Sequence, residues 1–143
     1  MIRFIVWLVR ISEFSLTPTI ILSQERQDAI HDLVVNADEL KLDFILVVGG
    51  WDSSNTAHLL EIPEKVGVRS FHINKSDCIG ADNTITHRTV KGEIVTEKFL
   101  LDIEDPDREL VMGVTSGAST PDAAVQDSLS SIFLLKKMSS SGD

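Results

Sequence analysis

Hydroxyl side chains gather in a loop that follows the apolar run at residues 110–114. Thr115, Ser116 and Ser119 are separated only by a glycine and an alanine, so no bulky side chain blocks the backbone there. Free backbone N–H groups at a helix start, with hydroxyls beside them, bind phosphate or carboxylate groups. An ordinary capped helix start would use the same residues without a ligand, and the loop alone leaves both interpretations open.

A strand before this loop and a helix after it must position these hydroxyls. The short apolar run at 110–114 is typical of a strand covered on both faces. Thr120 can cap the next helix, Pro121 suits the first helical position, and Asp122 complements the helix dipole. Apolar residues at helical spacing then form a core stripe, namely Val125, Leu129, Ile132 and Phe133.

The same arrangement occurs earlier in the chain. An apolar run at 43–48 ends in two glycines, and Ser53, Ser54 and Asn55 follow it before a second helical pattern. In open α/β sheets, ligands bind outside the carboxyl ends of parallel strands, where two such loops meet. The two loops together therefore predict one shared anion site.

The two loops also carry a family resemblance. Residues 49–56 (GGWDSSNT) and 113–122 (GVTSGASTPD) together closely resemble the C-terminal third of the LytB/IspH family. Residues 24–29 and 79–88 are similar to the plant and cyanobacterial branch of that family. The resemblance covers about residues 23–137, and several ordered motifs at matching spacing make it far more specific than a single glycine motif.

The resemblance implies a part of an iron–sulfur oxidoreductase, 4-hydroxy-3-methylbut-2-enyl diphosphate reductase. The family makes isopentenyl and dimethylallyl diphosphate in non-mevalonate isoprenoid biosynthesis, and three cysteines hold its [4Fe–4S] cluster. Ser53, Ser54, Asn55 and Ser119 match the positions at which the family binds the substrate diphosphate. Activity would also need the family's other domains and an electron donor such as ferredoxin. The implied compartment is the plastid stroma in a photosynthetic eukaryote and the cytoplasm in a bacterium.

The cluster cysteine expected in this part of the family is replaced. Ile20 stands at its position when counted back from the following arginine, and Ile21 when aligned on the preceding Thr-Ile. Neither side chain can ligate iron, which requires thiolate, and Cys78 is not at a ligand position. Asp52 replaces the family's usual asparagine beside the proposed anion site. We therefore expect no cluster in this chain alone, which is either the C-terminal part of a reductase or a degenerate or truncated stand-alone anion-binding module without redox activity.

Composition limits the other classes of function. The chain has 143 residues, 43% of them apolar and 24% charged, as expected for one globular domain. A net charge of −9 argues against a nucleic-acid partner, and the absence of a long apolar run argues against a membrane helix. The net charge also means that hydroxyls, backbone amides and helix dipoles, rather than a lysine cluster, must hold any diphosphate. A single cysteine excludes an intrachain disulfide.

These patterns predict one three-layer α/β domain at 23–137, with a mainly parallel sheet flanked by helices. Strands are expected near 44–48, 69–73 and 110–114, and helices near 23–40, with Ser23 as its cap, 55–66 and 121–137. A weaker signal predicts a hairpin joined at residues 91–92. Residues 1–22 form a segment of uncertain structure, with a strand as one alternative, residues 102–109 a solvated acidic loop, and residues 138–143 a flexible tail.

The four histidines and the single cysteine are interpreted as structural residues and not as metal ligands or catalytic groups. The four histidines lack metal-site spacing, so a zinc site is not expected. His31 and His58 are predicted on helix surfaces and His72 in a strand. Cys78 is interpreted as a small loop residue, because no base is evident beside it.

Overall fold

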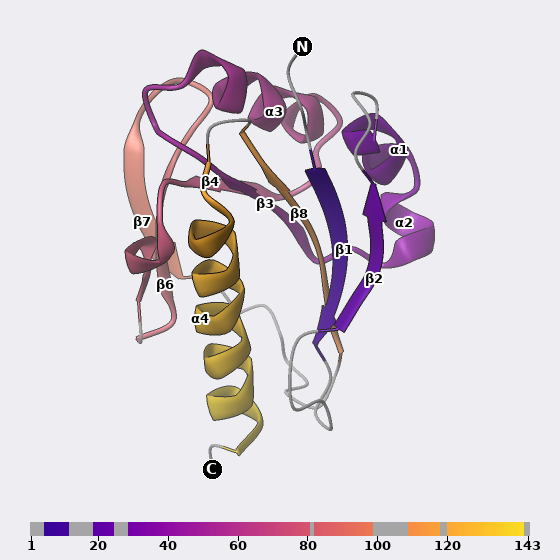
Figure 1. Ribbon diagram of the computed structural model, residues 1–143, viewed down its shortest axis with the longest axis vertical. Coiled ribbons are helices and arrows are strands. Elements are labelled where there is room, and N and C mark those ends of the chain that lie inside the picture. The colour runs from indigo at the N-terminus through magenta and orange to yellow at the C-terminus, as the bar shows by residue number, and fades with distance from the viewer. Residues whose placement is uncertain are drawn as a thin grey trace.

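The computed structural model describes residues 5–11, 19–24, 29–80, 82–98, 109–117 and 120–141. Within these residues the strands are β1 (Ile5–Ile11), β2 (Thr19–Gln24), β3 (Phe44–Val48), β4 (Ser70–Ile73), β5 (Ile79–Gly80), β6 (Thr84–Arg88), β7 (Ile94–Lys98) and β8 (Leu110–Ser116). The helices are α1 (Ala29–Val35), α2 (Ala37–Leu40), α3 (Ser54–Lys65) and α4 (Asp122–Ser141), with a short 3-10 turn at Ser76–Cys78. All the strands belong to one sheet (Figure 1), in the order β2-β1-β8-β3-β4-β6-β5, and β7 pairs with β6.

The centre of the sheet is parallel and its edges are antiparallel. β3 runs parallel to both β4 and β8, so the three strands predicted from the sequence lie side by side. β1 adds antiparallel to β8 and β2 to β1, while β6 adds antiparallel to β4 on the opposite edge. The α/β class is confirmed, and the sheet as a whole is mixed, because antiparallel strands extend its parallel centre on both edges.

Helices cover the two faces of the sheet and make three layers. Successive side chains of a strand point to opposite faces. Phe44, Leu46 and Val48 of β3 therefore pack in one core with α4, whereas Ile45 and Val47 pack in a second core with α1 and α3. All five side chains are buried, which explains why this strand appears in the sequence as a continuous apolar run.

The helix predicted at 23–40 is wrong at its start and is interrupted near its end. Ser23 does not cap a helix but lies in β2, where it pairs with Trp7 of β1. Helix α1 ends at Val35, and the Asn36 side chain donates to the Asp32 carbonyl oxygen (2.9 Å) before α2 begins. Strand pairing with β1 overrides the local capping signal, as tertiary context commonly does. Helical spacing in the sequence predicts five residues that face the sheet. Four of them, Ala29, Ile30, Leu33 and Val34, are buried in α1, whereas the fifth, Ala37, lies in α2 and is only partly buried.

The other predicted helices and the hairpin are confirmed with shifted ends. α3 runs from Ser54 to Lys65, with Pro63 in its last turn, and Gly67 follows at φ 78°. α4 begins at Asp122 and continues past the predicted end at 137 to Ser141. β6 and β7 form the hairpin, with Gly92 at φ 89° in its turn. The acidic stretch 102–109 lies outside the described residues except for its last member.

Part of the segment 1–22 is a strand, one of the alternatives that the sequence left open. β1 pairs with β8 along its whole length, from Ile5 opposite Ser116 to Ile11 opposite Leu110. The domain limits at 23 and 137 stay predictions. Among the described residues, no helix is both long enough and apolar enough to cross a membrane.

Candidate anion-binding site

The two predicted loops meet at one edge of the sheet. β3 and β8 are parallel neighbours, so their carboxyl ends lie together, next to the starts of α3 and α4 (Figure 1). The carbonyl oxygen of Val48, at the end of β3, accepts the Gly117 N–H (3.1 Å) and the Thr120 hydroxyl (3.2 Å) from the other loop. The Thr120 hydroxyl, predicted as a helix cap, thus ties the β8–α4 loop to β3.

The first loop combines a capped helix start with exposed polar side chains. Ser53 is extended (φ −81°, ψ 117°), and its hydroxyl oxygen accepts the Thr56 N–H at 3.3 Å. A hydroxyl that accepts one bond still has a proton to donate, so the cap leaves Ser53 able to bind an anion. Ser54 and Asn55 are exposed in the first turn of α3. The structure therefore brings these three predicted site residues together.

The second loop is shorter than the sequence predicted. Thr115 and Ser116 belong to β8, and both are buried. Their hydroxyls are therefore not part of the loop, because pairing with Ile5 of β1 and with Val48 of β3 carries the strand on to Ser116. Ser119 lies outside the described residues, although Gly117 and Thr120 on either side of it in the sequence are placed.

Small residues let the two loops approach each other. A Cβ atom on Gly49 would lie 2.6 Å from Thr56 Oγ1 and 3.1 Å from Thr120 Oγ1. A Cβ atom on Gly117 would also collide with Thr56 Oγ1. Both positions need glycine because of this close approach. Sequence reasoning missed Thr56, since only the tertiary structure shows that it lies between the two glycines.

Hydrogen bonds fasten the first loop to strand β4. Gly49 N–H donates to the Ile73 carbonyl oxygen (2.9 Å), and the Trp51 indole N–H donates to the His72 carbonyl oxygen (3.1 Å). The His72 ring bonds through Nε2 to the Gly49 carbonyl oxygen at 2.9 Å. Because a carbonyl oxygen only accepts, Nε2 carries the hydrogen, and the buried Nδ1 has no hydrogen-bond partner among the described residues.

The burial of His72 favours its neutral form. Desolvation lowers the pKa of His72, the hydrogen bond to the Gly49 carbonyl opposes this change, and the nearby Arg88 charge adds to the lowering. The sequence predicted His72 as a strand residue, which is confirmed, but gave no sign of its contact with the glycine loop.

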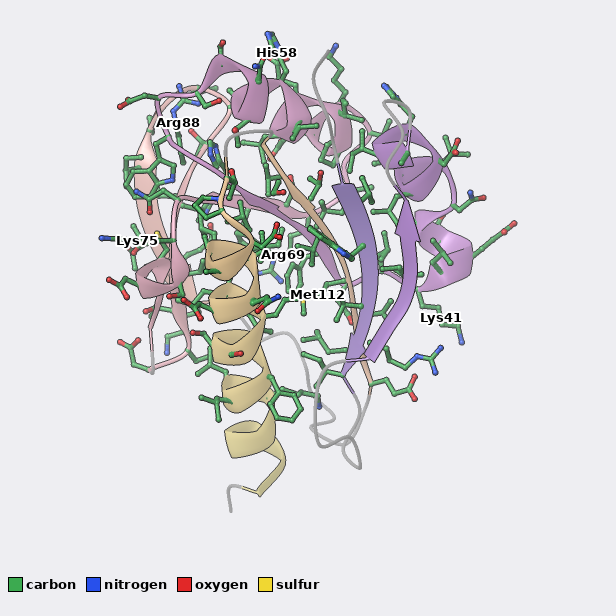
Figure 2. All side chains as sticks on the ribbon, viewed as in Figure 1. Lys41, His58, Arg69, Lys75, Arg88 and Met112 are labelled. Atoms are coloured by element: carbon green, nitrogen blue, oxygen red, sulfur yellow. The ribbon has the colours of Figure 1, made fainter. Side chains whose placement is uncertain are left out.

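An open pocket of about 510 Å³ lies beside the start of α3, lined by Trp51, Asp52, Ser53, Ser54, Ala57, His58, Glu61, Arg88 and Gly92. In Figure 2, Arg88 lies near the start of α3 and His58 on the outer side of that helix. His58 bonds Glu61 at 2.9 Å, and this hydrogen bond lowers the pKa of the Glu61 carboxyl. Arg88 favours an anion in this pocket, whereas Asp52 and Glu61 oppose one. His31 and His58 are exposed on their helices, as predicted.

The residues present do not fit an iron–sulfur cluster. The Cys78 thiol is buried and donates to the Asn74 side-chain oxygen at 3.0 Å. Ile20 and Ile21 lie in β2, the edge strand, where the register shifts between Leu8 and Val9 of the paired strand. Across the described part of the chain, no group of three His, Cys, Asp or Glu side chains could hold a metal ion. A cluster needs several thiolates, and the whole sequence contains one cysteine.

Comparison with known proteins gives the family. A family model described as "LytB protein" matches residues 17–133. The chloroplastic 4-hydroxy-3-methylbut-2-enyl diphosphate reductase of Botryococcus braunii is 48% identical over 124 residues, which cover 84% of this chain and 24% of that protein. The reductase of a Picosynechococcus species is 46% identical over 114 residues, covering 80% and 26%, and that of Prochlorococcus marinus is 48% identical over 105 residues, covering 73% and 24%.

No solved structure matches the chain. The chain spans about a quarter of the length of these reductases. The family model nevertheless covers most of this sequence, including both loops at the sheet edge. The chain therefore belongs to the LytB family.

Proposed function

We propose that this chain supplies the diphosphate-binding part of a 4-hydroxy-3-methylbut-2-enyl diphosphate reductase, in which Ser53, Ser54, Asn55 and Ser119 hold the substrate diphosphate. The observation that carries the proposal is the meeting of the two loops at Val48, whose carbonyl oxygen accepts bonds from Gly117 and Thr120. Ser54 and Asn55 are exposed at that edge, and Ser119 directly precedes Thr120 in the sequence. The relatives are named for a diphosphate substrate, which fits a paired anion loop.

The binding chemistry is that of hydroxyls, an amide and helix N–H groups. The start of α3 presents N–H groups and a positive dipole end, both of which favour an anion. Asp52 is exposed beside Ser53, and the chain carries a net charge of −9, so repulsion weakens binding. We expect a dissociation constant from millimolar to high micromolar, roughly −4 to −6 kcal/mol.

The complete reaction needs groups from outside this chain. In the proposed reductase, other domains supply the cluster cysteines, and an electron donor such as ferredoxin supplies two electrons for the reductive loss of the substrate hydroxyl. The residues of this chain bind and orient the diphosphate end of the substrate. The compartment is the plastid stroma if the source is a photosynthetic eukaryote and the cytoplasm if it is a bacterium.

A stand-alone anion-binding module without redox activity is the second candidate. It is favoured by the isoleucines at the expected cluster position and by the Cys78 thiol, which is buried and bonded to Asn74. Sequencing the transcript upstream of the codon for Ser23 separates the two candidates. A Thr-Ile-Cys motif and the remaining domains in frame would support the reductase, whereas a transcript that encodes only the present residues would support the module.

Amide shifts in NMR spectra test diphosphate binding. On addition of inorganic diphosphate or isopentenyl diphosphate, shifts should be confined to residues 53–55 and 115–119 and should be lost in Ser119→Ala. Ser130→Ala is the matched control, because Ser130 is an exposed serine on α4 away from both loops. Shifts elsewhere, or none at about ten millimolar ligand, would leave only helix capping as the role of these residues.

A further inference from the structure

Thr56 differs from its neighbours in the first turn of α3. Ser54 and Asn55 are exposed, whereas Thr56 is only 1% exposed and points toward the sheet. The backbone N–H of Thr56 is the group that Ser53 Oγ accepts at 3.3 Å. Thr56 is thus bonded through its backbone to one residue of the proposed site, while its side chain is directed to the other loop.

The side chain of Thr56 fills the space between the two loops. Both of its branches face Gly49, because a Cβ atom there would lie 2.6 Å from Oγ1 and 2.8 Å from Cγ2. Oγ1 is also the nearest side-chain atom to the corresponding point on Gly117. One side chain therefore contacts the end of β3 and the start of the β8–α4 loop together.

A β-branched side chain is suited to hold this spacing. Two heavy atoms on Cβ restrict χ1 in a helix, and the close approach of Gly49 and Gly117 confines the two branches of Thr56 further. The absence of a Cβ atom on both glycines lets their backbones close onto these branches. A shorter side chain at position 56 would leave an unfilled space between the two loops. The distance between the loops would then no longer be fixed by packing.

We infer that Thr56 is the positioning residue that sets the separation of the two diphosphate loops. The inference rests on the proposed function, since it assigns the spacing to diphosphate binding. Thr56 acts through the loops, because its shape fixes the distance between the turn that carries Ser53–Asn55 and the start of the other loop at Gly117. Binding groups must be held to a fraction of an ångström to act together, so the spacing controls affinity.

Three substitutions separate shape from hydrogen bonding. Thr56→Val keeps both branches and should bind inorganic diphosphate within about twofold of the unchanged chain, whereas Thr56→Ala and Thr56→Ser should bind roughly tenfold more weakly. Leu60→Val is the matched control, because Leu60 is one turn further along the same face of α3, is equally buried and lies away from the loops. That control should lose thermal stability but keep its affinity. Full binding by Thr56→Ser together with lost binding by Thr56→Val would overturn the inference in favour of a hydroxyl hydrogen bond.

A second measurement tests the spacing without any ligand. Nuclear Overhauser contacts from the Thr56 methyl group to the α-protons of Gly49 should be present in the free chain. Gly117→Ala should lower the melting temperature, because its Cβ atom would collide with Thr56 Oγ1. In a chain that already carries Gly117→Ala, Thr56→Ala should lower the melting temperature much less than it does alone, because it removes the clashing atom. Additive losses, or absent contacts, would refute the role of Thr56 even if diphosphate binds. Contacts and coupling without diphosphate binding would refute the proposed function while leaving the packing intact.

Discussion

The buried ring of His72 should make the stability of the fold depend on pH in a defined window. His72 is 0% exposed, its Nε2–H donates to the Gly49 carbonyl oxygen, and its Nδ1 has no partner in the part of the chain that the structure describes. Desolvation lowers its pKa in the folded state below the ordinary value of 6.5. The unfolded chain therefore binds a proton more readily than the folded chain. The contribution of neutral His72 to the free energy of unfolding is fully present above the unfolded-state pKa of about 6.5, and it is lost as the pH falls toward the folded-state pKa of His72.

The size of this loss follows from one proton. At about pH 5.5, roughly nine in ten unfolded chains carry the proton on His72, so the loss relative to neutral pH is at most about 1.4 kcal/mol, the limit for a folded chain that stays neutral. His72→Gln removes the titration, and its side-chain amide can still donate to Gly49. The pH-dependent loss should therefore be smaller in His72→Gln than in the unchanged chain, by up to that amount.

Urea unfolding at about pH 7.5 and 5.5 measures the difference. His31→Gln is the matched control, because it replaces an exposed histidine of α1 and leaves the glycine loop untouched. For each variant, the unfolding free energy at the lower pH is subtracted from that at the higher pH. The effect of His72 is the difference between these two values. Equal changes in His72→Gln and His31→Gln would refute the assignment of a buried neutral ring to His72.

Three further outcomes are expected. Gly113→Ala should lower the free energy of unfolding in urea by about 1–3 kcal/mol, because its Cβ atom would collide with the Leu33 side chain. The double variant Gly113→Ala/Leu33→Ala should lose less stability than the sum of the two single losses, and strict additivity would contradict the contact. Ser53→Ala should lower the free energy of unfolding by about 1 kcal/mol, because it removes the cap of α3. Ser53→Asp should keep the cap and its stability but weaken diphosphate binding through its negative charge. Unchanged binding in Ser53→Asp would argue against a ligand at this turn. Anaerobic incubation with iron and sulfide should give no absorbance band at about 400 nm that corresponds to one cluster per chain. A brown product would show that this chain can ligate a cluster without the expected cysteine.

The sequence predicted the elements whose signals are local. The strand at 44–48 has the predicted limits, because a run buried on both faces must be apolar throughout. The start of α3 was also predicted to within one residue, since Ser53 supplies a cap that acts within a single turn. The parallel arrangement of β3, β4 and β8 followed from the alternation of strands and helices along the chain, although their order in the sheet did not.

The errors arise where distant segments decide the local structure. Ser23 has the type of a helix cap, but its backbone pairs with Trp7 in the β1–β2 ladder. Thr115 and Ser116 have the types of loop hydroxyls, but pairing with Ile5 and Val6 of β1 keeps them in β8. The deciding partners are strands from other parts of the chain, namely β1 for Ser23 and both β1 and β3 for Thr115 and Ser116. The importance of Thr56 was hidden for a similar reason, because its two glycine contacts come from loops far apart in the sequence.

Helix capping and anion binding are not competing explanations of the first loop. Successive residues of a helix point about 100° apart, so one turn presents different side chains to the core and to solvent. Ser53 accepts the Thr56 N–H, Thr56 itself packs between the loops, and Ser54 and Asn55 remain exposed at the sheet edge. The cap thus fixes the turn from which the exposed pair can reach a ligand. A variant that restores the cap but repels an anion, such as Ser53→Asp, therefore distinguishes the two roles within a single residue.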